Sequence, residues 1–247
     1  MYLKTQGLIL RVTDYNDRDA LVTMLTPNHG KLTVKARSLR RKNSPLSATC
    51  QLLAYSEFTL FEYKGMYSVN EAESVELFTG LRKDICKLSL GTYFAQVAEL
   101  ISQEDLSNPE LLSLVLNCLF ALSKTDEPER KIKAAFELRC ACLAGFQPDL
   151  GNCYGCGAEQ ADMFDLSAGH LSCFSCRADD ASGVRMPINP SILNAMRYIC
   201  TCMPKKLLSF QLGDENLLKL SDITEGYLLT QLERGFSTLD FYKSLMI

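Results

Sequence analysis

Four cysteines arranged in two close pairs are the residues of this sequence with the clearest chemistry. Cys153 and Cys156 form one Cys-x-x-Cys pair, and Cys173 and Cys176 form the second pair after a spacer of sixteen residues. Each such turn lets two thiolates hold one ion, and two turns supply the four sulfur ligands of a tetrahedral zinc site. Four thiolates leave no open coordination position for a reactive water. The spacing therefore predicts one structural Zn²⁺ per chain.

Two other roles compete for these cysteines. A redox-active Cys-x-x-Cys pair usually begins a helix in a βαβ context, and the sequence around the cluster lacks that context. A catalytic metal would need a different ligand at one position, and His170 is the nearest candidate, although we interpret it as a loop residue. A zinc-dependent hydrolase is accordingly the least favoured of three functions, after DNA binding and a protein-interaction scaffold. Outside the cluster, we interpret four further cysteines as buried apolar residues: Cys118, Cys140, Cys142 and Cys200.

A basic segment is the second feature with recognisable chemistry. Residues 1–80 carry ten basic and eight acidic side chains, although the whole chain has a net charge of −3. Between Asp19 and Glu57 there are six basic residues and no acidic one: Lys31, Lys35, Arg37, Arg40, Arg41 and Lys42. Positive charge that follows a strand and its adjoining loop is what a phosphate backbone needs. The alternative is a solvated basic strand with no ligand.

The elements that must position these residues follow from the hydrophobic pattern. Residues 1 to about 78 alternate in short runs such as "KLTVKAR", with a hairpin turn expected at Lys64-Gly65. About five short strands predict a small oligonucleotide/oligosaccharide-binding (OB) barrel. After Gly80 the period becomes helical, and Asn108-Pro109 and Asn189-Pro190 are expected to begin helices. The predicted fold class is α+β and multidomain: an OB barrel at 1–79, then an all-α domain at 80–247 with a zinc-binding module inserted at about 150–185.

Composition and motifs exclude several classes of protein. With 47% hydrophobic and 22% charged residues, the chain has the composition of a soluble protein. The most apolar stretch, Leu111–Leu122, is too short to cross a bilayer, and no leader opens the sequence, so we expect a cytoplasmic protein without membrane contact. There is no nucleophile elbow, phosphate-binding glycine loop or His-Glu-x-x-His motif, so no enzyme is predicted.

Three stretches resemble the bacterial DNA repair protein RecO family, over essentially the whole chain. They read "GLILRVTDYNDRDALVTMLTPNHGKLTVKARSLRRKNS", "FELRCACLAGFQPDLGNCYGCG" and "STLDFY". The resemblance implies an OB barrel and a helical domain with a zinc site. It also implies binding of single- and double-stranded DNA, strand annealing, and help in loading recombinase onto coated strands in recombinational repair. The implied partners are RecR and the C-terminal tail of the single-stranded DNA-binding protein, in the bacterial cytoplasm and at the nucleoid during repair.

The resemblance also implies which residues act. The family's basic barrel surface falls on the six basic residues named above, with Arg11 as an addition, and there are no catalytic residues to carry over. For the acidic tail peptide, "ERKIKAAFELR" offers Arg130, Lys133 and Arg139 around apolar residues, although a packed helix with solvated basic residues is the alternative. The alternative function for the whole protein is a protein-interaction scaffold that zinc stabilises and that has little intrinsic nucleic-acid binding.

Overall fold

The computed structural model describes residues 1–176 and 183–246, and the chain divides into two compact units. The first comprises Met1–Asp126 together with Phe236–Ile247, and the second comprises Glu127–Gly235. The units do not follow the expected division at residues 79 and 80, because helices that follow the barrel belong to the first unit. The boundary near residue 80 stays a prediction.

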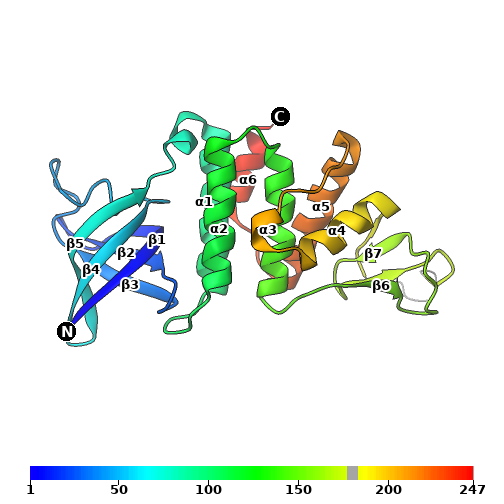
Figure 1. Ribbon diagram of the computed structural model, residues 1–247, viewed down its shortest axis with the longest axis horizontal. Helices are drawn as coiled ribbons and strands as arrows, with labels where there is room; N and C mark the ends of the chain where they lie inside the picture. The colour runs from blue at the N-terminus through cyan, green and yellow to red at the C-terminus, as the bar shows by residue number, and fades with distance from the viewer. Residues whose placement is uncertain (177–182, 247) are drawn as a thin grey trace. The chain divides into compact units, whose positions relative to one another are not determined.

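Five strands of the first unit form a closed barrel (Figure 1). They are β1 (Tyr2–Asp14), β2 (Ala20–Leu25), β3 (Lys31–Ala36), β4 (Tyr55–Tyr63) and β5 (Met66–Glu76). The order around the barrel is β1-β2-β3-β5-β4, and β4 pairs with β1 to complete the ring. Every neighbouring pair is antiparallel except β3 and β5, which are parallel.

The alternation of the strands fills the barrel as the sequence predicts. On β3 the apolar residues Leu32, Val34 and Ala36 are buried in the barrel core. The hairpin between β4 and β5 turns at Lys64-Gly65, where both residues have positive φ (51° and 77°). Two successive positive φ angles match the right-handed twist of the flanking strands, which is why a glycine is favoured there.

Three α-helices complete the first unit. The 3₁₀ turn η1 (Thr79–Lys83) leads into α1 (Ile85–Ile101) and α2 (Pro109–Lys124), and α6 (Ser237–Ser244) joins them from the end of the chain. The predicted start of α2 is confirmed, since Asn108 accepts a hydrogen bond from the backbone of Leu111 and Pro109 occupies the first turn. The ring of Tyr93 on α1 meets Phe236, just before α6, edge to face at 5.4 Å.

The second unit combines helices with a small sheet. Its helices are α3 (Glu129–Leu143), α4 (Pro190–Thr201), η3 (Pro204–Lys206) and α5 (Asp214–Gln231). Its strands are β6 (Asp149–Cys153), β7 (Met163–Asp165), β8 (His170–Ser172) and β9 (Arg185–Pro187), in the order β6-β8-β7-β9. Residues 177–182 of the predicted module lie outside the described residues. The sequence predicts an all-α domain outside the zinc-binding module, and the structure adds a sheet of four strands around the cysteine cluster.

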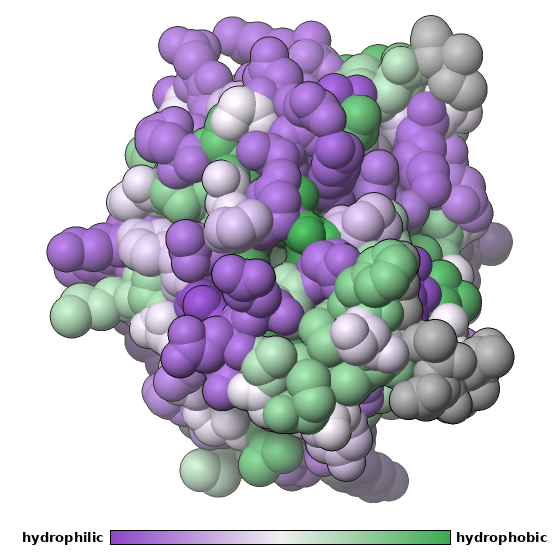
Figure 2. All heavy atoms as spheres, turned by 90° about the vertical axis from the view of Figure 1, so that its right-hand side faces the viewer, coloured by the Kyte–Doolittle hydropathy of each residue, from purple (hydrophilic) through white to green (hydrophobic). Residues whose placement is uncertain are grey.

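The surface is mixed in polarity. Figure 2 shows a face on which hydrophilic side chains predominate and a group of apolar side chains lies among them. Among the described residues, no helix has both the length and the apolar character that a membrane span requires.

Candidate metal centre and nucleic-acid interface

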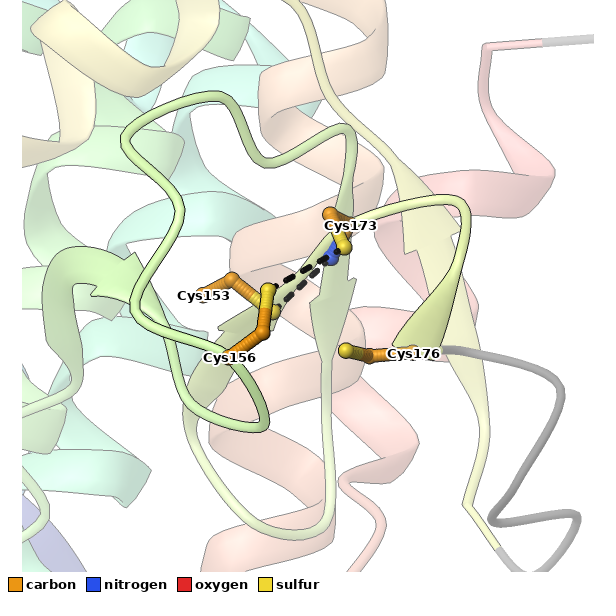
Figure 3. Close-up of side chains that lie close together, drawn as sticks. All are labelled: Cys153, Cys156, Cys173 and Cys176. Atoms are coloured by element: carbon orange, nitrogen blue, oxygen red, sulfur yellow. Dashed lines mark hydrogen bonds between the residues drawn. The ribbon is translucent and has the colours of Figure 1, made fainter.

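Two parallel neighbouring strands bring the cysteine pairs together. Cys153 ends β6, and Cys173 directly follows β8. Strands β6 and β8 are paired in parallel, with Cys153 opposite Leu171, so both strands stop at the same end of the sheet. Figure 3 shows the four side chains converging there, two from each Cys-x-x-Cys turn.

The four sulfur atoms have the spacing of a metal site. All of them lie within 4.8 Å of one another, and the Sγ atoms of Cys156 and Cys173 are 3.7 Å apart. Four sulfurs at about 2.3 Å from a central Zn²⁺ would define a tetrahedron with edges of about 3.8 Å. The donor set and its spacing are therefore compatible with one structural metal ion.

Hydrogen bonds prepare one of these sulfurs to be a ligand. Burial raises the pKa of the Cys153 thiol, but backbone N–H groups of Cys156, Cys173 and Gly155 outweigh it and lower the pKa to about 6. Hydrogen bonds with Cys156 and Cys173 raise the pKa of Cys176 to about 12. A negative charge is thus concentrated at Cys153, and a cation that enters would release the remaining protons.

Neighbouring residues fix the two turns. A Cβ on Gly155 would lie 3.0 Å from the Sγ of Cys176, closer than most real Cβ contacts, so a larger residue would push the two turns apart by a few tenths of an ångström. The buried carboxylate of Asp165 accepts hydrogen bonds from the backbone of Ser167 and Ala168 and from Arg185, which ties β7, its turn and β9 together. His170 is not part of the cluster, and its ring stacks on Tyr154 with centroids 4.4 Å apart.

Two predicted DNA-binding residues hold the barrel against α1. The guanidinium of Arg11 forms an ion pair with Glu99 at 2.8 Å. The ammonium of Lys31 donates a hydrogen bond of 2.9 Å to the backbone carbonyl of Glu99. Both cations therefore serve the first unit internally, and a phosphate would have to compete with α1 for them.

Two more of the predicted cations organise the basic loop. Lys35 pairs with Asp19 at 3.0 Å, and Arg40 pairs with Asp14 at 3.0 Å and donates to the carbonyl of Asn16. Asp19 also accepts a hydrogen bond from the backbone of Ser38. This bond, followed by those from Lys35 and Asn16, holds the pKa of Asp19 well below its usual range. The segment after β3 is thereby fastened to the segment between β1 and β2.

Three predicted cations are exposed and form no ion pair with any acidic residue in the described part of the chain: Arg37, Arg41 and Lys42. Sequence reasoning missed a fourth, Arg18, whose backbone carbonyl accepts a hydrogen bond from the backbone N–H of Arg40. Arg18 is exposed as well. Arg18 lies before the acid-free segment between Asp19 and Glu57, so only the backbone contact with Arg40 shows that it belongs with the other basic residues. We call Arg18, Arg37, Arg41 and Lys42 the loop cations.

The residues predicted to bind an acidic peptide do not form a surface together. Arg130 is exposed, but Lys133 is 2% exposed and lies between Glu137 and Glu225, at 3.0 and 2.8 Å. Lys133 is therefore not accessible to a peptide in this structure, because the packing of α3 on α5 buries its ammonium among these carboxylates. Arg139 is half-buried and donates to the carbonyls of Ile199 and Cys200 on α4. The apolar residues between them, Ile132, Phe136 and Leu138, are fully buried.

Comparisons with known proteins cover nearly the whole chain. Residues 1–78 match the family model "Recombination protein O N terminal", and residues 82–240 match "Recombination protein O C terminal". A DNA repair protein RecO from Acetivibrio thermocellus is 32% identical over 99% of this chain and 97% of its own length. The RecO protein of Alkaliphilus metalliredigens is 28% identical over 99% and 100%, and that of Bacillus subtilis 26% over 92% and 88%.

Proposed function

Because the chain belongs to the RecO family of recombination proteins, we propose that it is a DNA repair protein that binds DNA on its barrel and brings complementary strands together. The family membership rests on two family models that match consecutive parts of the chain, and on relatives named DNA repair protein RecO. We further propose that the five-stranded barrel is an OB fold, whose strands and loops suit it to nucleic acid.

The observation that carries DNA binding is the group of loop cations beside β3. They are exposed and no described acid pairs with them. The segment after β3, which bears three of them, is fastened through Asp19 and Arg18 to the segment that bears the fourth. A cation whose backbone is held and whose charge is unpaired gives up less loop freedom, and no ion pair, when it meets a phosphate. Such contacts release counterions from DNA and do not depend on base sequence. Both single and double strands are accordingly proposed ligands.

Strand annealing follows from the same charges. Two DNA strands repel each other, and a surface that neutralises phosphates lowers that repulsion while leaving the bases open to pair. No covalent step is involved, so the proposed role is that of a non-catalytic mediator. The remaining steps, loading of recombinase with RecR and docking on the C-terminal tail of the single-stranded DNA-binding protein, are proposed from the family alone.

The metal has a structural part in this proposal. One Zn²⁺ held by the four cysteines would cross-link the two turns at the end of the sheet where β6 and β8 stop. With all four positions occupied by sulfur, it would supply no reactive water. We propose that the protein works in the bacterial cytoplasm, at the nucleoid during repair.

The test is annealing of two complementary oligonucleotides, each coated beforehand with single-stranded DNA-binding protein. Three proteins are compared: the unchanged chain, a variant with Arg37, Arg41 and Lys42 replaced by alanine, and a control with Lys83, Lys205 and Lys206 replaced by alanine. Both variants lose three exposed positive charges that no described acid pairs. We expect acceleration by the unchanged chain and the control, and its loss in the loop variant. Equal annealing by both variants would remove the loop from the mechanism.

A second candidate function is a protein-interaction scaffold with weak nucleic-acid binding. One observation favours it: four of the seven predicted DNA-binding cations are already engaged within the chain. The net charge of −3 points the same way. If the unchanged chain neither binds nor anneals DNA while its metal site is filled, the scaffold becomes the better proposal.

A further inference from the structure

A second pair of thiols lies in the second unit, apart from the four-cysteine cluster. Cys142 is on the last turn of α3 and Cys200 is on the last turn of α4, and their Sγ atoms are 3.6 Å apart. Cys200 is buried and Cys142 is half-buried. The interpretation of both as plain core residues misses this contact, because 57 residues separate them in the sequence.

The surroundings make the two thiols unequal. Arg139, one turn before Cys142, donates to the carbonyls of Ile199 and Cys200 and so places its positive charge beside the pair. The hydrogen bond between Cys142 and Cys200 lowers the pKa of Cys142; burial opposes this and the charge of Arg139 adds to it. The same hydrogen bond, with burial, raises the pKa of Cys200. The other titratable neighbours are Cys202 on the α4 side and Tyr227 on α5.

The pair can be reached from solvent. A cavity of about 710 Å³ has Cys200 in its wall, together with Arg197, Tyr198, Pro148 and Leu150. A molecule of peptide size could enter a space of this volume. Cys142 is itself half-buried, and its Sγ atom lies 3.6 Å from that of Cys200, which lines the cavity.

We propose that Cys142 and Cys200 form a thiol-modification site that reacts with small-molecule disulfides of the glutathione class. The Cys142 thiolate attacks one sulfur of the small disulfide, a mixed disulfide forms, and the other half leaves as a thiolate that takes up a proton. Cys200 then loses its proton and attacks the Cys142 sulfur, which releases the second half as a thiol. Two cysteines are oxidised to one disulfide, and one small disulfide is reduced to two thiols.

The geometry allows this closure. Closure requires the sulfurs to approach from 3.6 Å to about 2.05 Å. The bond would join the ends of α3 and α4 and enclose the whole four-cysteine sheet in a covalent loop. This site is independent of the proposed DNA binding, since none of the loop cations belongs to the second unit.

The experiment treats the full, zinc-loaded chain with oxidised glutathione in the absence of oxygen, blocks the remaining thiols and maps disulfides by mass spectrometry. Cleavage before Asp149 and after Arg197 separates Cys142 and Cys200 from the cluster, and fragmentation distinguishes them from Cys140 and Cys202. We expect the loss of two thiols per chain, a Cys142–Cys200 bridge and retention of the metal. No variant is needed for this result, so it stands even if a substitution disturbs folding.

Substitutions then test the order of events. C200S should stop at one glutathione on Cys142, and C142S should leave Cys200 unmodified. C118S, which removes a fully buried lone thiol, should behave as the unchanged chain. A bridge that involves Cys202 instead, or modification confined to the metal ligands, would overturn the proposal. So would a chain whose thiols all survive a concentration of oxidised glutathione that oxidises a model dithiol.

Discussion

Replacing Lys133 by methionine should destabilise the second unit strongly. The Lys133 ammonium pairs with Glu137 and Glu225 and also meets the carbonyl and hydroxyl of Ser221, at 3.4 and 3.3 Å. Glu137 is completely buried and also accepts a hydrogen bond from the hydroxyl of Thr224. Methionine has a similar length and no charge, so the variant tests the charge and not the volume.

The expected cost follows from what remains behind. Removing one partner of a buried ion pair leaves an uncompensated charge, which typically costs about 3–5 kcal/mol. Lys131→Met is the matched control, two residues earlier on the same helix. Lys131 pairs with Glu127, whose side chain is 34% exposed and can be hydrated, and lies 5.3 Å from the ring of Phe210. Its loss should cost only about 1 kcal/mol.

The pH dependence gives a second, independent signature. Burial raises the pKa of Glu137, and Lys133 counteracts this, so the pKa should rise further in the Lys133→Met variant. Between the unfolded pKa of about 4.3 and the raised folded pKa, the folded state binds the extra proton. The free energy of unfolding of the variant therefore falls as pH rises in that window, by up to about 1.4 kcal/mol per pH unit.

Urea unfolding at pH 6 and pH 8, followed by circular dichroism and by hydrogen exchange of α3 and α5 amides, measures both effects. The double variant Lys133→Met/Glu137→Gln should recover part of the loss, since it removes the stranded charge. If Lys133→Met costs no more than Lys131→Met, or if its cost does not change with pH, the buried network does not stabilise this unit as reasoned.

Three further predictions follow from the surface and the metal site. Replacing Arg37, Arg41 and Lys42 by alanine should lower the slope of log K against log salt on duplex DNA by about 2.7, and the Lys83, Lys205 and Lys206 control should keep its slope; equal slopes would exclude the loop from the interface. Metal analysis should find one zinc per chain, and its removal by a chelator should increase hydrogen exchange in β6 and β8 but not in the barrel. Gly155→Ala should weaken zinc affinity by about tenfold or more, because its methyl group meets the Sγ of Cys176, whereas Gly213→Ala, which meets nothing within 4 Å, should leave it unchanged.

Local sequence patterns predicted the strand faces, the helix starts and the cysteine cluster of this protein. The alternation "KLTVKAR" predicts which side chains of β3 enter the barrel, because successive residues of a strand point to opposite faces whatever the strand pairs with. Asn108-Pro109 marks a helix start, since the capping side chain bonds backbone groups three residues away. The spacing of the cysteines likewise predicts the four sulfurs that the structure brings within 4.8 Å of one another, as each turn forms within four residues.

Local patterns could not predict which residues the charged and thiol side chains contact, because those partners lie far away in the sequence. Lys133 and Arg139 read as exposed cations on an amphipathic helix, yet α5 buries the first and α4 engages the second, at 60 to 88 residues' distance in sequence. Asp19, which fastens the basic loop, lies 16 residues before Lys35, and the two thiols of the proposed modification site are further apart still. A sequence determines the period, the caps and the ligand types of each segment. Which cations stay free for a ligand depends on which segments meet, and only the tertiary structure decides that.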